Sequence, residues 1–532
     1  MWRRTYFLLL LVRLWFALSP SYLHPDENFQ GPEVIAGRVF GYPVHQTWEF
    51  TSKHPIRSSF PLWICYGIPM ATLRGIGEGI AEEVPPYVVY WTLRVMMFVL
   101  SFVLEDWAIL ELVSPHQRSS ASMLVASSYV TWTLQTHTFS NSLETLALIW
   151  SLGDPGGAPL QVANCAAKKR SSLSATAILG FISVFGFFNR ITFPAYLIIP
   201  LLQLVPHFHR KPLSLIALLL SATITTIIAV ISDTTFYHPD GLTLSTLVHR
   251  PVITPLNNFL YNSSAHNLAQ HGLHPYYQHI IANLPQLIGP AFPLLIFNYR
   301  KNLRLAAALS GVALLSLFPH QEARFLLPAI PLILSSVRLP INPKIRRAWM
   351  FVWVTFNAAM GLLMGVYHQG GVIPAQMWIA RSGEPAVTSV YWWKTYSPPV
   401  WLLNGKNEVI NTVDLMGMKP DDMVGRVANG TSCSNAELDM GGKKGEREIT
   451  YLVAPKSATF LDAFSNQWVD GDGKEKRAFK LEEVWSYKHH LNLDDMDFGD
   501  DGVLQTLQRV VGRRGIVVWK VQKDCGSDSK LL

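Results

Sequence analysis

Charge is scarce in this chain of 532 residues. Only 15% of the residues are Asp, Glu, Lys or Arg, against 49% hydrophobic residues, and the mean hydropathy is +0.20. Soluble globular proteins carry about 25% charged residues, so the composition excludes an ordinary soluble enzyme. The apolar residues come in blocks of roughly 15 to 25, the length that a helix needs to cross a bilayer. The sequence therefore predicts an α-helical polytopic membrane protein.

Familiar phosphate-binding and hydrolytic motifs are missing as well. The chain has no P-loop, Rossmann glycine pattern, GxSxG elbow or HExxH pair, so nucleotide cradling, serine hydrolysis and zinc-protease chemistry have no starting point. Four cysteines are too few for a disulfide scaffold. Cys433 and Cys525 both lie in the tail, where they could pair in an oxidising compartment. The net charge of +7 is assigned to short loops between spans, and no nucleic-acid partner is expected.

About eleven membrane spans are predicted from the apolar blocks. They lie at about 5–19, 87–113, 119–138, 142–152, 173–189, 193–206, 213–231, 280–297, 303–318, 325–338 and 348–367. The first is predicted to stay in the mature chain, because Arg13 interrupts it and no small-residue cleavage site follows. The apolar segment 60–76 precedes an acidic stretch and is expected either to span, to dip into the membrane or to lie along it.

Basic residues fall in alternate loops, which predicts that those loops are cytosolic. The opposite, luminal side then collects the loop 20–59, the loop 232–279 and everything after 368. Two glycosylation sequons, at Asn262 and Asn429, fall on that side. Residues 1–369 are predicted to form a catalytic membrane domain. Residues 370–532 are richer in charge and glycine and are predicted to form a small luminal α/β domain.

Two adjacent carboxylates follow the first predicted span. Asp26 and Glu27 lie about seven residues beyond it, in a loop that cannot stray far from the bilayer. Acids in a loop are usually solvated charge, and that alternative stays open on position alone. Here His24, Pro25 and Phe29 make the setting stiff and partly apolar, so the pKa of a carboxylate is expected to rise toward a value useful for a base. A base at this depth would serve a reaction of a lipid substrate.

A second polar cluster lies in PHQEARFLLP, residues 319–328, in a turn between two predicted spans. His320, Glu322 and Arg324 crowd this turn at membrane depth, where each needs a partner or a ligand. One alternative is a self-contained pair of Glu322 and Arg324 that caps a helix. The other is that His320 and Arg324 hold an anionic leaving group, because guanidinium binds phosphate oxygens as a fork.

The loop 255–279 is rich in histidine and asparagine. No metal is expected there, because Pro275 interrupts helical spacing and no cysteine joins the histidines. Asn, His and Tyr side chains mixed with aromatics suit a sugar or a polar headgroup, and a merely structured loop is the alternative. The candidates for substrate binding on this side of the membrane are His24, Arg57, Arg190, His271, His274, His320, Glu322 and Arg324.

Three motifs together resemble a known enzyme family. They are HPDE at His24 to Glu27, NLAQHGLHP at Asn267 to Pro275 and PHQEARF at Pro319 to Phe325. In combination they resemble the GT-C mannosyltransferases of the endoplasmic reticulum, glycosyltransferase family 22. The resemblance runs over about residues 1–370, and the tail matches no motif. HPDE is shared with enzymes that add the third mannose of the glycosylphosphatidylinositol (GPI) precursor, whereas the other two motifs favour those that add the fourth.

The resemblance implies a GT-C fold, a luminal site in the endoplasmic reticulum and no cofactor. Its implied substrates are two lipids: dolichyl phosphate mannose as donor, and the GPI precursor, whose third mannose receives a fourth in α-1,2 linkage. A β-linked donor that gives an α-linked product requires inversion, which a single displacement supplies. In the family the acidic pair of the first luminal loop supplies the catalytic carboxylate, which implies Asp26 or Glu27 here. We expect Asp26 to be the base and Glu27 to assist in charge and positioning. His320 and Arg324 are expected to stabilise the leaving phosphate.

Three rival functions stay open. The first is a GPI third-mannose transferase or an N-glycan dolichol-dependent mannosyltransferase, which the sequence separates only through the loop motifs. A secondary transporter would carry acids inside its spans and symmetric halves. A non-catalytic scaffold would tolerate replacement of Asp26 and Glu27. No protein partner can be named from the sequence.

Overall fold

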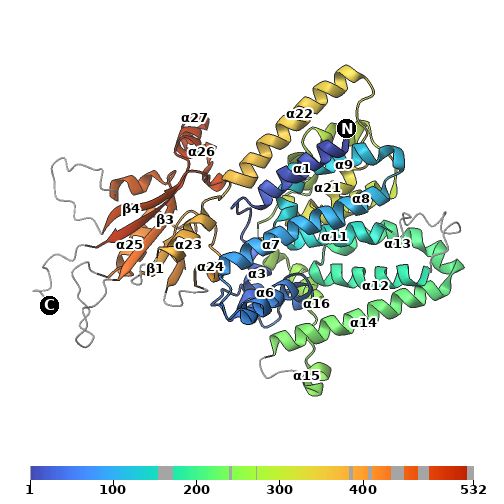
Figure 1. Cartoon of the computed structure of the whole chain (residues 1–532), viewed down its shortest axis with the longest axis horizontal. Coiled ribbons are helices and arrows are strands. Elements are labelled where there is room, and N and C mark those ends of the chain that lie inside the picture. Colours follow the sequence, from blue (N-terminus) through green and yellow to red (C-terminus); the bar gives the residue numbers. More distant parts are fainter. Residues whose placement is uncertain are drawn as a thin grey trace, which may run out of the picture.

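The computed structural model of the chain describes residues 2–153, 172–238, 243–270, 272–382, 387–404, 410–432, 448–464 and 479–523. It is mostly helical, with one five-stranded sheet near the C-terminus (Figure 1). The longer helices are α1 (Trp2–Ala17), α7 (Pro86–Leu100), α11 (Ser140–Leu152), α12 (Ser172–Asn189), α13 (Phe193–Arg210), α14 (Pro212–Tyr237), α20 (Leu303–Leu315) and α22 (Pro343–Leu362). Shorter helices include α2 (Asp26–Phe29), α3 (Pro32–Phe40), α4 (Trp48–Thr51), α15 (Leu244–His249), α16 (Thr254–Asn262), α17 (Ala265–Ala269) and α24 (Val400–Asn404).

Three helical stretches of the described residues are long and apolar enough to cross a membrane. They are Pro86–Leu112, Pro212–Tyr237 and Pro343–Tyr367, with shorter apolar helices at Leu173–Asn189 and Leu303–Leu315. The first and third extend α7 and α22 through π-helical turns. This number is smaller than the eleven predicted spans, because several apolar blocks are broken or too short.

The broken blocks belong to the interior of the helical region. Residues 280–297 include α18 (Leu284–Ile288) and α19 (Ala291–Phe297), which are separated at Gly289. The φ angle of Gly289 is +46°, a backbone conformation that glycine adopts more easily than other residues. Residues 325–338 contain only a 3₁₀ turn and α21 (Ala329–Leu334), whose six residues are all buried. A helix that is apolar all round lies in a protein interior or in a membrane, so these two blocks are not single long helices, and the number of about eleven spans stays a prediction.

The segment 60–76 is helical throughout. It comprises α5 (Ser59–Leu62), a π-helical turn and α6 (Ile68–Gly79). Ile68 and Ile76 are exposed on α6, and Arg74 Nη1 donates to the carbonyl oxygen of Val39 at 2.8 Å. The segment therefore packs beside α3 and keeps an apolar face outward.

A buried ion pair explains the charge inside the first helix. Arg13 of α1 is fully buried, and its Nη2 lies 3.1 Å from Asp106 Oδ2. Tyr6 donates to the same oxygen at 2.5 Å, and Arg13 Nη1 donates to Ser101 Oγ at 3.2 Å. Asp106 and its buried neighbour Glu105 lie in the stretch Pro86–Leu112. Two acids therefore lie within a predicted span, and one of them, Asp106, is paired with a cation between two helices.

The sheet has the order β2-β1-β3-β5-β4. Its strands are β1 (Val387–Trp392), β2 (Asn411–Asp414), β3 (Ile449–Pro455), β4 (Lys480–Tyr487) and β5 (Ile516–Gln522). β1 pairs in parallel with β2 and β3, whereas β5 pairs antiparallel with β3 and β4. The central strand β3 is buried at all seven positions, as expected for a strand covered on both faces. The helices α23 (Val372–Arg381) and α25 (Pro420–Asn429) accompany it.

The sheet region shares its core with the loop that follows α1. One buried cluster joins Val34 and Ile35 of α3 to Val390 of β1 and Val518 of β5. Tyr22 donates its hydroxyl to the carbonyl oxygen of Ser397 at 2.7 Å. The tail is therefore packed onto the first loop rather than tethered beside it.

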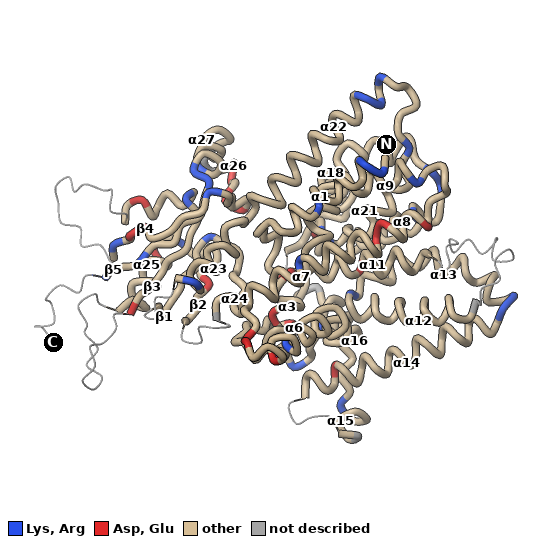
Figure 2. The backbone as a smooth tube through the Cα atoms, in the orientation of Figure 1, with Lys and Arg blue, Asp and Glu red and all other residues tan. Residues whose placement is uncertain are grey.

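Basic segments gather at the end of the helical region that faces away from the sheet. Figure 2 shows them near the N-terminus, at the turn between α13 and α14 and at the start of α22. These segments belong to the loops that are predicted to be cytosolic, and the sidedness of the chain stays a prediction.

Candidate functional site

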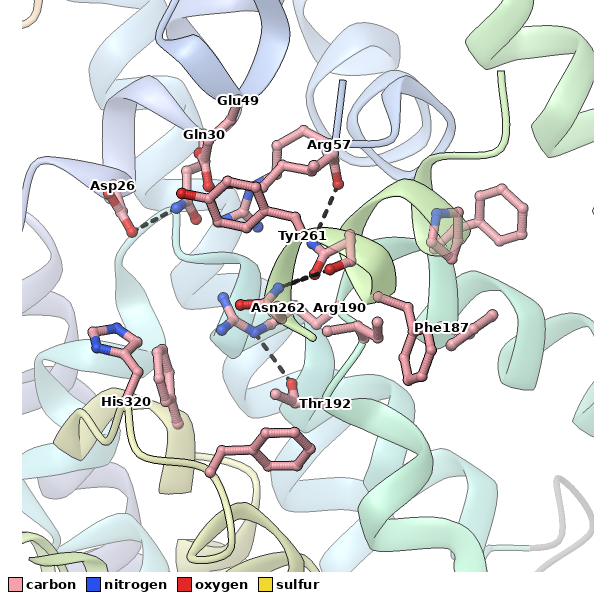
Figure 3. Close-up of a pocket in the computed structure, with 18 of the residues that line it drawn as sticks. Asp26, Gln30, Glu49, Arg57, Phe187, Arg190, Thr192, Tyr261, Asn262 and His320 are labelled. Atoms are coloured by element: carbon pink, nitrogen blue, oxygen red, sulfur yellow. Dashed lines mark hydrogen bonds and ion pairs between the residues drawn. The ribbon is translucent and has the colours of Figure 1, made fainter. Parts of the chain in front are cut away.

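A cavity of about 1050 Å³ lies among α2, α4, α16, the turn between α12 and α13, and the segment 318–325. Its polar lining gathers near Asp26, Arg190 and His320, whereas Phe187 lies toward the other end (Figure 3). Further apolar lining comes from Phe188, Ile191, Ala195, Ile253, Leu256, Phe259, Leu268, Leu315 and Phe318. The cavity is amphipathic, and its lining suits a ligand that has both a charged group and a hydrocarbon chain.

Asp26 stands at the start of α2, within hydrogen-bonding reach of two donors. Its Oδ2 accepts from Gln30 Nε2 at 2.5 Å and from Nη1 of Arg324. Arg324 also donates through Nε to Glu322, and the other oxygen of Glu322 lies 3.0 Å from His320 Nε2. A chain of four side chains, Asp26, Arg324, Glu322 and His320, thus connects the two polar motifs. The pair of Glu322 and Arg324 is present, but it is not self-contained, because Arg324 also binds Asp26.

The electrostatics of Asp26 differ from the expectation. Burial by itself would raise the pKa of this carboxyl, but Arg324, His24 and Arg57 together hold the pKa below its ordinary value. The expected upward shift is therefore wrong for Asp26, which is ionised at neutral pH. The pKa of Glu322 is likewise held far below its ordinary value by Arg324 and His320, although burial opposes this.

Glu27 lies behind Asp26 and away from the cavity lining. It is 1% exposed, and its Oε2 is 2.5 Å from His137 Nδ1. Thr138 donates to the backbone oxygen of Glu27 at 2.5 Å. Burial raises the pKa of Glu27 to about 8, although Arg94 opposes the shift. The two adjacent acids are thus in different surroundings, since consecutive residues at the start of a helix point in different directions.

The other candidate arginines line the same cavity, each beside a carboxylate. Arg57 donates through Nε and Nη2 to Glu49 Oε1, at 3.1 and 2.9 Å. Arg190 lies 3.4 Å from Glu144 Oε2 and donates to Ser140 Oγ at 2.9 Å. Burial lowers the pKa of Arg190 to about 10, so it keeps its charge at neutral pH.

The two histidine-containing motifs contact each other. The backbone N–H of His274 donates to Pro319 O at 2.7 Å, and Gln321 N–H donates to His274 Nδ1 at 3.3 Å. Gln321 Oε1 accepts from the N–H of His279 at 2.9 Å. His274 therefore supports the turn 319–321 instead of lining the cavity. His271 lies outside the described residues.

The sequons differ in their surroundings. Asn262 lines the cavity at the end of α16, whereas Asn429 is exposed at the end of α25. Cys433 and Cys525 lie outside the described residues, so their pairing stays a prediction. Among the residues that the structure describes, no group of three His, Cys, Asp or Glu side chains is placed to hold a metal ion.

Several lining residues carried no motif signal. Gln30, Trp48, Glu49, Asn258 and Tyr261 all line the cavity. The sequence indicated them only in that they lie in the loops 20–59 and 232–279, which are predicted to be luminal. His137 and Arg94, which contact each other at 2.6 Å beside Glu27, lie in predicted spans and could not be connected to the first loop from sequence.

Fold and cavity together define a helical membrane protein with an amphipathic, charge-lined cavity. A family model described as the Alg9-like mannosyltransferase family matches residues 4–403. The chain belongs to this family, and it is therefore a glycosyltransferase.

Relatives match almost the whole chain. GPI mannosyltransferase 4 of Aspergillus oryzae is 49% identical, over 98% of this chain and 99% of the relative. The protein of that name from Emericella nidulans is 48% identical, over 98% of each chain, and that from Saccharomyces cerevisiae is 35% identical, over 93% and 95%. The similarity thus continues through the tail, beyond residue 370.

One similar solved structure is the crystal structure of ArnT from Cupriavidus metallidurans bound to undecaprenyl phosphate. It is 12% identical, with a TM-score of 0.47 over 97% of this chain and 98% of that chain.

Proposed function

We propose that the chain transfers mannose from dolichyl phosphate mannose to the third mannose of the GPI precursor, in α-1,2 linkage. This adds the fourth mannose. The proposal is supported by relatives that are named GPI mannosyltransferase 4 and match this chain almost end to end. The structural observation that carries it is the contact of Asp26 with Arg324 in a cavity whose lining is partly charged and partly apolar.

The donor is an amphipathic anion, and the cavity suits each of its parts. Arg324, His320 and Arg190 offer cationic groups to the phosphate, and guanidinium groups bind phosphate oxygens through paired N–H donors. Phe187 and the apolar lining near it offer room for the first part of a hydrocarbon chain. The proposed donor site therefore holds the phosphate at the polar lining and the start of the lipid chain at the apolar lining.

The reaction is a single displacement with inversion. The acceptor hydroxyl attacks the anomeric carbon of the donor mannose, its proton passes to Asp26, and the bond from that carbon to the phosphate oxygen breaks. Dolichyl phosphate leaves with the bonding electrons. Arg324 stabilises the charge that develops on the leaving phosphate, in a site where such contacts are stronger than in water.

Arg324 also couples the two substrates electrostatically. In the structure it lowers the pKa of Asp26, which keeps the carboxylate ionised but weakly basic. When Arg324 turns toward a phosphate, its attraction for the Asp26 carboxylate falls, and the pKa of Asp26 rises. The base therefore becomes stronger when the donor is in place.

Glu27 has a positioning role in this mechanism. It is buried against His137, and the adjacent backbone oxygen accepts from Thr138. These contacts fix the N-terminal turn of α2 and so the direction of the Asp26 side chain.

The site is proposed to face the lumen of the endoplasmic reticulum, with the sheet region on the same side. The basic segments at the opposite end of the helical region support this orientation (Figure 2).

The test is complementation of cells that lack the fourth-mannose activity. The intact chain, Asp26→Asn and Glu27→Gln are expressed at matched levels, and GPI precursors are measured by mass. We expect the intact chain to restore the four-mannose precursor, Asp26→Asn to accumulate the three-mannose precursor, and Glu27→Gln to restore product more slowly. An intact, correctly located chain that adds mannose to a different acceptor would favour a sister transferase instead.

A further inference from the structure

The wall of the cavity formed by α4 and α16 carries an aromatic pair. The ring centroids of Trp48 and Tyr261 are 4.7 Å apart, with an angle of 32° between the ring planes. Both residues line the cavity, and Trp48 is 41% exposed. Figure 3 shows the Tyr261 ring reaching across the cavity toward Gln30 and Asp26. An amphipathic aromatic surface beside polar groups can stack on the C–H face of a sugar ring while its hydroxyls find partners.

Two asparagines extend this wall. Asn262 Nδ2 donates to the backbone oxygen of Asn258 at 2.9 Å and to its Oδ1 at 2.6 Å. Both amide hydrogens of Asn262 are therefore committed within α16. Its carbonyl oxygen is the group that can accept a hydrogen bond from a sugar hydroxyl.

The wall is held rigidly. Asn257 Nδ2 donates to Pro55 O at 3.0 Å, and Asn258 Nδ2 donates to Ile56 O at 3.3 Å. At the start of α16, Thr254 Oγ1 donates to the buried carboxylate of Asp233 at 2.7 Å, which also accepts from Ser59 N–H at 2.7 Å. A side chain held by such supporting contacts is ready to bind without reorganisation.

The wall also lies where an acceptor has to enter. Figure 3 places Glu49 and Arg57 on the opposite side of the cavity from His320, with Asp26 at the flank between them. In a displacement with inversion, the nucleophile approaches opposite to the leaving group. If the phosphate lies at Arg324 and His320, the acceptor sugar arrives from the side of α4 and α16, within reach of Asp26.

We infer that Trp48, Tyr261 and Asn262 form the subsite for the acceptor mannose, the sugar whose hydroxyl attacks the donor. This inference rests on the proposed function and adds to it the residues that recognise the acceptor. It has a second consequence. Asn262 stays unglycosylated although it is in a sequon, because a glycan on Nδ2 would remove one of its two hydrogen bonds and fill the subsite.

The kinetic test uses the full chain in microsomes, with dolichyl phosphate mannose and a synthetic trimannosyl GPI analogue. Trp48→Leu and Tyr261→Leu keep an apolar side chain at each position but remove the aromatic faces. Each is expected to raise the KM for the acceptor about three- to tenfold, with the KM for the donor unchanged. Phe351→Leu is the matched control, because Phe351 is a 73% exposed aromatic residue on α22, outside the cavity lining.

The outcomes separate the two proposals. If the intact chain does not transfer mannose to the trimannosyl analogue, the proposed function is wrong. If the intact chain is active but Trp48→Leu and Tyr261→Leu behave like Phe351→Leu, or change only the KM for the donor, the subsite is wrong. Tyr261→Phe keeps the ring and is expected to stay close to the intact chain.

Peptide mass analysis provides an independent readout. Enzymatic release of glycans in ¹⁸O-water marks every occupied asparagine, and Asn262 is expected to be unmarked in the active protein. A glycan on Asn262 in active chains would overturn the subsite. The exposed Asn429 serves as the comparison site in the same sample.

Discussion

Two buried charge clusters in this molecule have similar composition and different surroundings. Arg13 and Asp106 lie between α1 and the stretch Pro86–Leu112, with side chains 0% and 4% exposed. Arg324 and Asp26 face the cavity, with side chains 12% and 22% exposed. A closed ion pair contributes mainly to which helices pack together, and removing one partner is costly. In a pair that faces a cavity, either side chain can leave its partner and bind a ligand instead. Access to the cavity therefore separates the pair suited to substrate binding from the pair that only holds helices together.

The largest expected effect is on activity at the open pair. Asp26→Asn should lower mannose transfer by about 10²- to 10⁴-fold, because an amide cannot accept the proton. The stability should change little, since Asn retains an oxygen for Gln30 and Arg324. Transfer in microsomes and protein level by immunoblot measure the two separately. Glu78→Gln, at an exposed acid on α6, is the control.

The closed pair should show the reverse behaviour. Arg13→Met leaves Asp106 buried without its cation and should cost about 3 to 5 kcal/mol of stability. Thermal unfolding in detergent measures the loss, and Asp106→Asn in the same chain should recover part of it. If Arg13→Met is as stable as the intact chain, the pair of Arg13 and Asp106 does not contribute to helix packing.

A smaller effect is expected when the charge of the open pair is kept. Arg324→Lys should lower kcat/KM about tenfold, because an ammonium group cannot reproduce the guanidinium contacts to Asp26 and Glu322 at once. The effect should appear mainly in the KM for the donor and in kcat. A change confined to the KM for the acceptor would contradict the placement of the phosphate.

The last effect concerns the pH dependence of stability. Glu33 is fully buried, and burial raises its pKa from 4.5 to about 8, against hydrogen bonds from His45 and Val400. Between these values the folded chain keeps a proton that the unfolded chain has lost. Its contribution to stability is therefore complete below the ordinary pKa and is lost as the pH rises through about 8.

Glu33→Gln should flatten this dependence, which for one proton is at most about 1.4 kcal/mol per pH unit. Unfolding temperatures of both chains at pH 6 and pH 8.5 measure it. An unchanged slope in Glu33→Gln would assign the dependence to other groups, among them Glu27, whose pKa is also about 8.

The sequence located much of the cavity because its charges are rare. In so apolar a chain, His24, Asp26 and Arg324 stand out, and all three line the cavity. The sequence could not show which way each side chain points. It treated Asp26 and Glu27 as a pair, whereas the turn of α2 sends one to the cavity and the other to His137.

The fold was predictable in class but not in the length of its helices. Apolar runs that cross a membrane and apolar runs that fill a protein interior have the same composition. The break at Gly289, where φ is positive, and the full burial of α21 become visible only in the folded chain. A sheet was expected in the α/β domain predicted after residue 370, but its packing against α3 brings together residues more than 350 positions apart.

That packing sets a biosynthetic order for the site. Glu33 Oε1 accepts from the N–H of Val400 at 3.2 Å, and Tyr22 donates to Ser397. The first loop therefore leaves the ribosome long before the residues that hold it in place. A nascent chain carries Asp26 from the outset, yet the loop around it reaches these two contacts only after residues 397–400 have been made, 367 to 375 positions further along the chain.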